Sequence, residues 1–499
     1  MSIAILPPAK KPSWRRAALV AASVPLVCVA LFCSVRAYQI YAHNRAADHD
    51  QFPSTTPLNS DESILIISPH PDDETLGAGG LIQNALKLGV PVHVVFMTDG
   101  DAFRVGVARY YHEFHVRTGD YIKYGMMREG ESRAALETLG LSSSDITFLG
   151  YPDQGTLPIW RAHWLPSDSF TSPYTYASSV PYPDALQPGA PYCGQSIVSN
   201  LATVIKQCHP TDIYTTHPSD DHPDHSAAPA YLNAALIGLA ISGDEWANDI
   251  RVHYFIVHRG DWPVPQGLDE DAPLAPPAPM ISLDTQWHTL DLSTGEVRTK
   301  KAALDHYASQ RELMQRFLTS FIRTNEIFGR LPDNNSPIPE VGNGAIDIDG
   351  DAQQWPSEKP FDVDPASDTV GRDFQPGADL RYVYVCADDN NLYVRVMTQQ
   401  ALSSEIHYNL YMRGFDSRGV TLDTGLLVSF CPRNVEAGQP TQMADGVRVA
   451  FDGNTLEESI PLSNFGRLRP SEIYLEAATL FSRVIVDRTG IRCGRLAPT

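Results

Sequence analysis

The sequence predicts an α/β protein with a Rossmann-like open parallel sheet and helices on both faces, followed by an all-β sandwich. Three observations predict this architecture. Short apolar runs alternate with helical patterns between residues 61 and 335, as in repeated strand–helix–strand units. Beyond about Pro339 the helical periodicity stops, and short β-like runs alternate with turn signals. An uncharged apolar run over residues 17–35 precedes both regions and has nearly the length of a membrane-spanning helix.

The composition excludes two broad classes of protein. The 499 residues include 43% apolar side chains, which is enough for a large core and argues against global disorder. The 59 acidic and 38 basic side chains give a net charge of −21. Because an acidic chain repels phosphate backbones, we expect no nucleic-acid partner.

Unequal charges flank the apolar run. Basic residues lie on both sides of it: Lys10, Lys11, Arg15 and Arg16 before, Arg36 and Arg45 after. The excess before the run favours a cytoplasmic tail (1–16), a single-pass anchor in the cell membrane (17–35) and a polar tether (36–60), with the rest extracytoplasmic. The alternative is a signal peptide whose cleavage would release a secreted protein, although the apolar part of a signal peptide is usually shorter.

The α/β domain is expected over residues 61–335. Its predicted strands cover 64–68, 92–98, 146–149, 212–216 and 251–257. Its predicted helices cover 75–88, 121–139, 194–207, 226–241 and 297–322. An insertion rich in aromatic residues, 155–192, is either a surface loop or a rim that shapes a substrate site.

The sandwich is expected over residues 340–499. Its predicted strands cover 381–385, 392–397, 406–412, 426–430, 447–451, 473–477 and 483–487. The acidic segment 346–351, Trp355 and the strand–turn–strand pattern 384–394 resemble carbohydrate-binding sandwiches of the family-9 type. This resemblance implies a sugar-binding domain, and the alternative is a structural or partner-docking sandwich.

A first cluster of polar residues follows the strand 64–68. It contains His70, Asp72 and Asp73, and its backbone is restricted by Pro69 and Pro71 on either side of His70. In open parallel sheets, ligands bind beyond the carboxyl ends of the strands, where this cluster lies. His70 and Asp73 are three residues apart and can converge on one cation, which leaves Asp72 free for proton transfer. The alternative is that these carboxylates cap the following helix.

A second cluster, 216–225, follows the strand 212–216 and contains His222 and His225. The two clusters can meet in one crevice, where His70, Asp73 and His225 would form a site with two histidines, one carboxylate and an open position. Three protein ligands with an open position are typical of a catalytic metal site. Zinc suits this donor set, and iron(II) or another divalent ion also accepts it.

The order of these motifs resembles the PIG-L/LmbE-like family of metal-dependent de-N-acetylases, over about residues 64–324. The matching segments are His70–Glu74, Thr98–Asp101, Arg128–Ser132, Tyr151–Asp153, His222–His225, Lys301–Ala303 and Ser309–Gln310. The resemblance implies that His70, Asp73 and His225 bind the metal and that Asp72 is the general base. It also implies that His222 stabilises the oxyanion or protonates the leaving amine, while Asp224 orients a histidine.

Four further residues are candidate substrate contacts. Asp99 and Asp101 follow the second strand, where they either bind substrate hydroxyls or cap a turn. Arg128 either contacts substrate or forms a helical ion pair with Glu131. Asp153 is either a turn residue or part of the active-site wall. The remaining histidines, His258 among them, lack metal-ligand spacing and are expected to be ordinary.

The resulting expectation is a zinc-dependent N-deacetylase. It would use metal-activated water to remove the N-acetyl group of an N-acetylglucosamine-type sugar or glycoconjugate. Two alternatives remain open: a carbohydrate-binding surface protein with an inactive hydrolase fold, and a deacetylase or amidase acting on a non-sugar amide.

Overall fold

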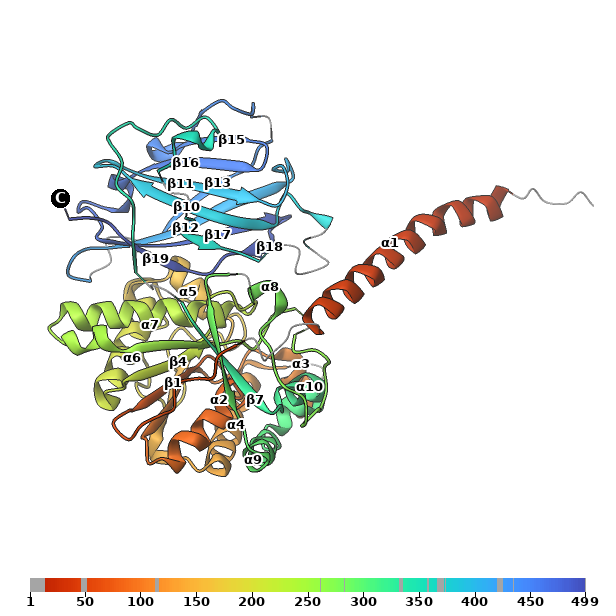
Figure 1. Cartoon of the computed structure of the whole chain (residues 1–499), viewed down its shortest axis with the longest axis vertical. Coiled ribbons are helices and arrows are strands. Elements are labelled where there is room, and N and C mark those ends of the chain that lie inside the picture. Colours follow the sequence, from red (N-terminus) through yellow and green to blue (C-terminus); the bar gives the residue numbers. More distant parts are fainter. Residues whose placement is uncertain are drawn as a thin grey trace, which may run out of the picture.

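A computed structural model places two regions against each other, a mixed α/β region and a β-rich region (Figure 1). The structure describes residues 14–45, 52–112, 116–260, 262–281, 283–331, 335–356, 359–365, 372, 374–419, 425–433 and 435–498. The side chains of 14–26 and 352 are not part of this description. Helix α1 (Trp14–Arg45) projects to one side of the two regions (Figure 1).

The predicted membrane anchor, 17–35, falls within α1. Most of the predicted cytoplasmic tail, residues 1–13, lies outside the described residues. In the described part of the chain, no helix combines the length and apolar character needed to cross a bilayer, so the predicted anchor is not supported there.

The α/β region contains a seven-stranded sheet. Its strands are β1 (Ile64–Ser68), β2 (Val92–Thr98), β3 (Ile146–Tyr151), β4 (Asp212–Thr216), β5 (Arg251–Phe255), β6 (Gln286–Asp291) and β7 (Asn325–Arg330). Their order is β3-β2-β1-β4-β5-β7-β6. The first five are parallel, which confirms the predicted parallel sheet, and β7 runs antiparallel to both β5 and β6. Strands β6 and β7 are not among the strands predicted from the sequence.

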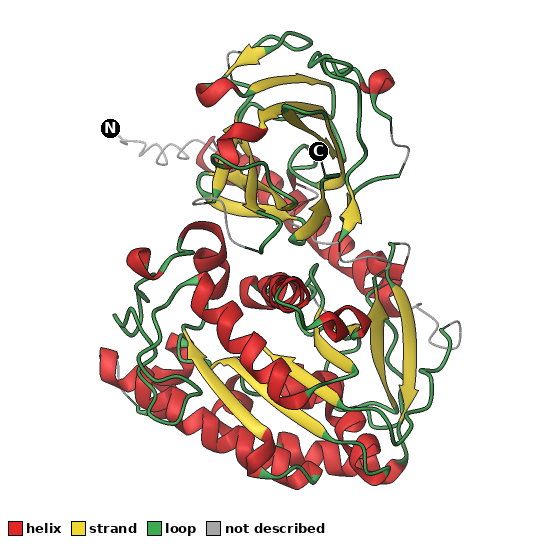
Figure 2. Cartoon of the chain, turned by 90° about the vertical axis from the view of Figure 1, so that its left-hand side faces the viewer, coloured by secondary structure: helices red, strands yellow, loops and turns green. Residues whose placement is uncertain are grey.

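Helices cover both faces of this sheet (Figure 2). One core lies beneath α2 (Asp73–Lys87), α4 (Thr118–Leu139) and α9 (Thr294–Leu304), and the other beneath α5 (Thr156–Ala162), α6 (Gly194–Cys208) and α7 (Pro223–Ile241). Successive side chains of β1 enter opposite cores, Ile64 and Ile66 the first, Leu65 and Ile67 the second. The remaining helices are α3 (Arg104–Tyr110), α8 (Ala278–Ile281) and α10 (Ala308–Leu318).

The predicted single helix over 297–322 is wrong. The chain forms two helices there, α9 and α10, separated by a turn that contains Tyr307. Tyr307 is fully buried, and its hydroxyl donates a hydrogen bond to Glu74 near the start of α2. The break therefore brings a side chain from this late segment to the first polar cluster.

The β-rich region contains two sheets. Its strands are β8 (Ser336–Pro337), β9 (Asp362–Val363), β10 (Leu380–Ala387), β11 (Asn391–Thr398), β12 (Ile406–Phe415), β13 (Leu426–Phe430), β14 (Thr441–Gln442), β15 (Arg448–Asp452), β16 (Thr455–Pro461), β17 (Glu472–Phe481), β18 (Val484–Arg488) and β19 (Arg492–Arg495). One sheet has the order β14-β15-β16-β11-β10-β9, the other β13-β12-β17-β19-β8, with β18 paired to β17. Both contribute to one apolar core, which includes Val394, Leu410 and Leu475. This confirms a separate β-rich C-terminal region.

The two regions also share apolar packing. Phe415, Tyr474, Ile491 and Cys493 of the β-rich region belong to the core beneath α5, α6 and α7. The ring of Trp160 lies 5.0 Å from that of Tyr474, edge to face. Since Trp160 belongs to the aromatic insertion 155–192, part of that insertion joins the two regions and does not form a substrate rim.

Glu458 is an unusual residue of the β-rich core. It lies on β16 between Leu456 and Ile460, is fully buried, and neither carboxyl oxygen has a hydrogen-bond partner among the described residues. Burial raises the pKa of this carboxyl from 4.5 to about 8. The folded state therefore binds a proton that the unfolded state releases above pH 4.5, so stability falls as the pH rises from 4.5 to 8.

Replacing Glu458 with glutamine should stabilise the protein. The neutral amide has no proton to take up, so we expect a gain of about 3 kcal/mol at pH 7 that vanishes below pH 4.5. Urea unfolding at pH 4, 6 and 8 measures this difference. Glu457→Gln is the matched control, because the Glu457 carboxyl accepts hydrogen bonds from Trp355 and Gly350. An equal gain in both variants would contradict the prediction.

Candidate active site

The two polar clusters of the sequence meet beyond the carboxyl ends of β1 and β4. A cavity of about 220 Å³ opens beside them. It is lined by His70, Asp72, Asp73, Leu76, Phe103, Arg128, Asp153, Gln154, His222, His258, Gln310, Met314, Phe317 and Leu318. Of the predicted site residues, six therefore line one cavity, together with apolar side chains from α10.

Three donor atoms of the predicted ligands converge. His70 Nδ1 lies 3.2 Å from Asp73 Oδ2 and 3.0 Å from His225 Nε2. His225 Nε2 lies 3.0 Å from the same Asp73 oxygen. All three side chains are buried, with Asp73 near the start of α2 and His225 in the first turn of α7.

Carboxylates surround the far side of the His70 ring. Its Nε2 lies 3.2 Å from Asp224 Oδ2 and 3.3 Å from Asp153 Oδ1. Asp224 is itself held by the backbone N–H groups of Gln154 (2.6 Å) and Thr156 (3.0 Å). Burial disfavours charge on His70, but Asp153, Asp224 and Asp73 raise its pKa well above the usual value. Asp224 thus contacts a histidine from behind, the position expected of an orienting carboxylate.

Asp220 contacts the ring of His225, the second predicted ligand histidine, and is not among the site residues predicted from the sequence. Its Oδ2 lies 3.3 Å from His225 Nδ1 and accepts hydrogen bonds from the backbone of Val257 and His258. Its Oδ1 accepts from the backbone N–H of His222 at 2.9 Å. Asp220 therefore ties the loop after β4 to the residues that follow β5. Its position five residues before His225 is the signal that could have identified it.

Asp72 has an unusual backbone. Its φ is +117°, a region that few residues other than glycine adopt, so the backbone is strained at this position. Asp72 occupies the N-cap of α2, yet among the described residues its side chain makes no capping hydrogen bond. Its carboxyl lines the cavity, 3.4 Å from Arg128 Nη2. The capping alternative is therefore wrong for Asp72.

The pKa of Asp72 is raised to about 8: burial is the largest cause, the Arg128 guanidinium opposes it, and Asp73 and Glu74 add to it. Glu74 also holds the strained segment. Its carboxyl accepts hydrogen bonds from the backbone of Asp72 (3.1 Å) and from the hydroxyls of Thr75 and Tyr307.

His222 is held in one tautomer. Its Nδ1 accepts a hydrogen bond from the backbone N–H of Asp224 at 3.3 Å, which leaves the ring proton on Nε2. Its ring lies edge to face with His70, 4.6 Å between centroids. Burial and the charges of His70 and His225 lower the pKa of His222 to about 3, so the ring is neutral. A neutral Nε2–H at the cavity can donate a hydrogen bond.

His258 was expected to be ordinary, and that prediction is wrong. It follows β5, lines the cavity and stacks on Phe317 with 5.3 Å between ring centroids. Together with Asp73 and His225 it forms one of the groups with metal-ligand spacing. Its place just beyond a parallel strand is the signal that could have found it.

Two of the four candidate substrate contacts lie away from the cavity. Asp99 and Asp101 are fully buried and do not line it. Asp101 accepts hydrogen bonds from the Tyr182 hydroxyl (2.7 Å) and the backbone of Asp153 (3.3 Å), so it supports the cavity wall from behind. Asp99 and Asp101 are not among the residues that line this cavity, and their direct contact with a substrate stays a prediction.

Arg128 and Asp153 do line the cavity. Arg128 donates hydrogen bonds to the backbone carbonyls of Gly100 (3.0 Å) and Pro71. Glu131, the alternative ion-pair partner, accepts hydrogen bonds from Ser309. Arg128 thus faces Asp72 and the cavity.

The residues fit a divalent cation. Two imidazole nitrogens and a carboxylate oxygen lie 3.0–3.2 Å from one another, a donor set that suits zinc and other first-row divalent ions. Burial disfavours charge on His225, but the carboxylates of Asp73 and Asp220 raise its pKa to about 9. The site therefore favours positive charge at this point.

The parallel sheet with helices on both faces and the histidine–aspartate cluster beyond its carboxyl edge place this chain among α/β proteins with a candidate metal centre. Comparison with known proteins gives its family. Residues 65–236 match the family described as PIG-L, GlcNAc-PI de-N-acetylase. A 1D-myo-inositol 2-acetamido-2-deoxy-α-D-glucopyranoside deacetylase of Mycolicibacterium smegmatis is 30% identical over 248 residues, 43% of this chain and 73% of that protein. The chain belongs to the PIG-L family.

Other similar proteins match about half of the chain. The deacetylase of the same name from Kribbella flavida is 27% identical over 297 residues, 54% of this chain and 90% of that protein. The solved structure of N,N'-diacetylchitobiose deacetylase from Pyrococcus horikoshii is 18% identical, with a TM-score of 0.32, over 54% of this chain and 82% of that one. The family match ends at residue 236, so the resemblance of the β-rich region to carbohydrate-binding sandwiches is not confirmed.

Proposed function

We propose that this protein removes the N-acetyl group from an N-acetylglucosamine-type sugar or glycoconjugate, with zinc as its metal. The observation that carries the proposal is the convergence of His70, Asp73 and His225 beside the cavity, with Asp72 next to them. Membership of the PIG-L family supports the reaction, and relatives named as deacetylases of an acetamido sugar support the substrate class.

His70, Asp73 and His225 would hold the metal. A divalent cation bound there supplies Lewis acidity, which polarises a carbonyl and lowers the pKa of water. Asp72 accepts the proton of the attacking water, which requires its ionised form. The Nε2–H of the neutral His222 donates a hydrogen bond to the oxygen on which negative charge develops. The proton taken up by Asp72 then passes to the leaving amine. Asp224 and Asp220 keep the two ligand histidines oriented.

Arg128 sets the pH at which the base works. Its positive charge, 3.4 Å from Asp72, favours the ionised carboxylate and lowers the pKa of Asp72. Arg128→Met should therefore raise that pKa and move the acidic limb of the kcat/KM profile upward by about 1 pH unit. Arg128→Lys, which keeps the charge, should move it less. Equal profiles in the wild type and Arg128→Met would contradict this role.

The proposed function is tested by acetate release from a panel of compounds. The panel contains N-acetylglucosamine, N,N'-diacetylchitobiose, an N-acetylglucosaminyl inositol and an N-acetylated amine without a sugar. We expect zinc-loaded protein to release acetate from at least one sugar and not from the non-sugar amide. Release only from the non-sugar amide would favour the amidase alternative. Sugar binding without acetate release would favour an inactive hydrolase fold.

A further inference from the structure

One arginine of the β-rich region reaches the loop that carries the second histidine cluster. Arg488 ends β18, and its side chain is 9% exposed. Its Nη2 donates hydrogen bonds to the backbone carbonyls of Asp220 (3.0 Å) and Asp221 (2.8 Å). Its Nη1 donates to the hydroxyl of Ser226. One guanidinium thus binds the loop on both sides of the segment 222–225.

The residues bound by Arg488 contact or adjoin both histidines of that segment. The carboxylate of Asp220 lies 3.3 Å from His225 Nδ1 and accepts the backbone N–H of His222. Ser226 directly follows His225. Because the Asp220 carbonyl and the Ser226 hydroxyl are both fixed by Arg488, a shift of this arginine would move the ligand atom of His225 and the cavity-facing proton of His222.

The position of Arg488 is itself fixed within the β-rich region. The neighbouring carboxylate of Asp487 accepts a hydrogen bond from the backbone N–H of Leu380 (2.7 Å), and it pairs with Arg372 (2.7 Å). Two residues further along, Gly490 packs so closely on Pro218 that an added Cβ would lie 2.8 Å from the proline side chain. The end of β18 therefore packs against the start of the loop 216–225, here named the metal-site loop.

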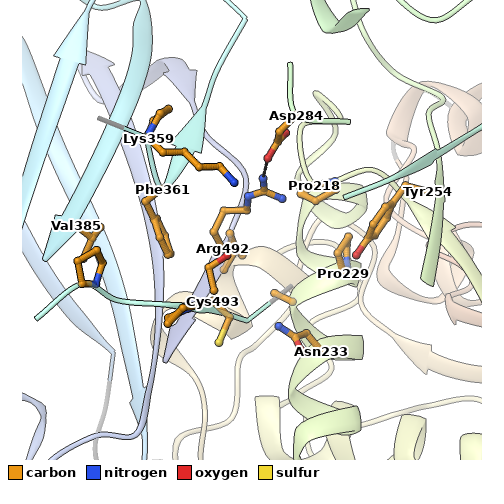
Figure 3. Close-up of a pocket in the computed structure, with 16 residues that line it drawn as sticks. Pro218, Pro229, Asn233, Tyr254, Asp284, Lys359, Phe361, Val385, Arg492 and Cys493 are labelled. Carbon is orange, nitrogen blue, oxygen red and sulfur yellow. Dashed lines mark hydrogen bonds and ion pairs between the residues drawn. The ribbon is translucent and has the colours of Figure 1, made fainter. Parts of the chain in front are cut away.

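Arg492 lies at the same interface between the two regions but does not bind the segment 222–225. It therefore serves as a comparison for Arg488. Arg492 of β19 pairs with Asp284 of the α/β region beside a cavity of about 260 Å³ between the two regions (Figure 3). It also contacts Asp362 of its own region at 3.1 Å. Arg488 and Arg492 are thus both largely buried at the interface, but they hold different partners.

We propose that Arg488 is a positioning residue for the active site, so that the β-rich region completes the site's structure. This inference rests on the proposed function for its catalytic consequence. The family model matches residues 65–236, so the region that supplies Arg488 lies beyond that matched segment. The deacetylase site of this chain consequently depends on residues from both of its regions.

The test compares Arg488→Lys with Arg492→Lys in the full-length chain. Both substitutions keep the positive charge at the interface and remove the planar fork, but only Arg488 bridges carbonyls of the metal-site loop. We expect Arg488→Lys to weaken Zn²⁺ binding about 10-fold or more in a chelator competition and to alter the visible spectrum of Co²⁺-loaded protein. We also expect faster amide hydrogen exchange over residues 217–226 and a lower kcat. Arg492→Lys should leave the loop exchange and the Zn²⁺ affinity close to wild type.

The separate measurements distinguish the possible failures. If the wild type released no acetate from any sugar, the proposed substrate would be wrong, while metal affinity and hydrogen exchange would still test Arg488. Wild-type exchange over 217–226 in Arg488→Lys would overturn the positioning role. So would equal losses in both variants, because that result would show a general weakening of the interface. Addition of guanidinium ion to Arg488→Ala should restore part of the Zn²⁺ affinity, and an absence of any restoration at all concentrations that leave the fold intact would count against the proposal.

Discussion

Asp72→Asn is expected to lower acetate release by about 10²–10⁴-fold while the protein keeps its metal. The amide has the shape of the carboxylate but cannot accept the proton of the attacking water. Asparagine also tolerates positive φ better than most residues, so the strained backbone at φ +117° should survive the substitution. The measurement is kcat/KM for acetate release, together with the zinc content of the purified variant.

Asp99→Asn is the matched control for this substitution. Asp99 is buried within the same region, does not line the cavity, and burial beside Glu129 raises its pKa well above the usual value. The amide closely replaces a protonated carboxyl, so activity should stay within a few-fold of wild type. Near-normal turnover of Asp72→Asn would assign the base to another group. A large loss in Asp99→Asn would instead support a direct role for that residue.

His225→Ala is expected to weaken metal binding by more than about 100-fold, because orienting residues alone are worth about 10–100-fold and this change removes a ligand. His225 Nε2 is one of three donor atoms within 3.2 Å of one another, so two would remain. The same change at His70 should have a similar effect. Competition with a zinc chelator measures the affinity, and circular dichroism shows whether the fold is intact.

His258→Ala and His222→Ala discriminate between the possible donor sets. His258 forms a group with Asp73 and His225, whereas His222 forms one with His70 and His225. If His70, Asp73 and His225 are the ligands, both variants should keep most of the metal affinity, and His222→Ala should lose activity. A loss of metal in His258→Ala equal to that in His225→Ala would place His258 in the ligand set.

The local sequence determined the parallel sheet and where its chemistry could lie. Continuous apolar runs such as Ile64–Ser68 are typical of strands buried on both faces, and the structure has the five predicted parallel strands. The polar clusters directly after two of these strands could be placed together because parallel strands end at one edge of a sheet. His70, Asp72, Asp73 and His222 accordingly line one cavity.

Antiparallel and late elements were harder to predict from sequence. Strand β6 (Gln286–Asp291) carries few apolar residues and lies at the edge of the sheet, so its pattern is weak. The break between α9 and α10 depends on Tyr307, which is drawn into a buried contact with Glu74. The helical pattern of apolar residues continues across this break. The break itself is caused by the contact of Tyr307 with Glu74, more than 200 residues away in the chain.

The sequence by itself predicted His70, Asp73 and His225 as a candidate metal site, because each half of that site is a short motif at the end of a strand. Only the tertiary structure decided which groups hold the motifs in place. Asp220 contacts His225, Glu74 holds the backbone of Asp72, and Arg488 contacts the loop 216–225 from the β-rich region. Each of these contacts depends on the packing of separate elements. The spacing of residues within a motif does not reveal a contact between residues 268 positions apart, such as that of Arg488 with Asp220.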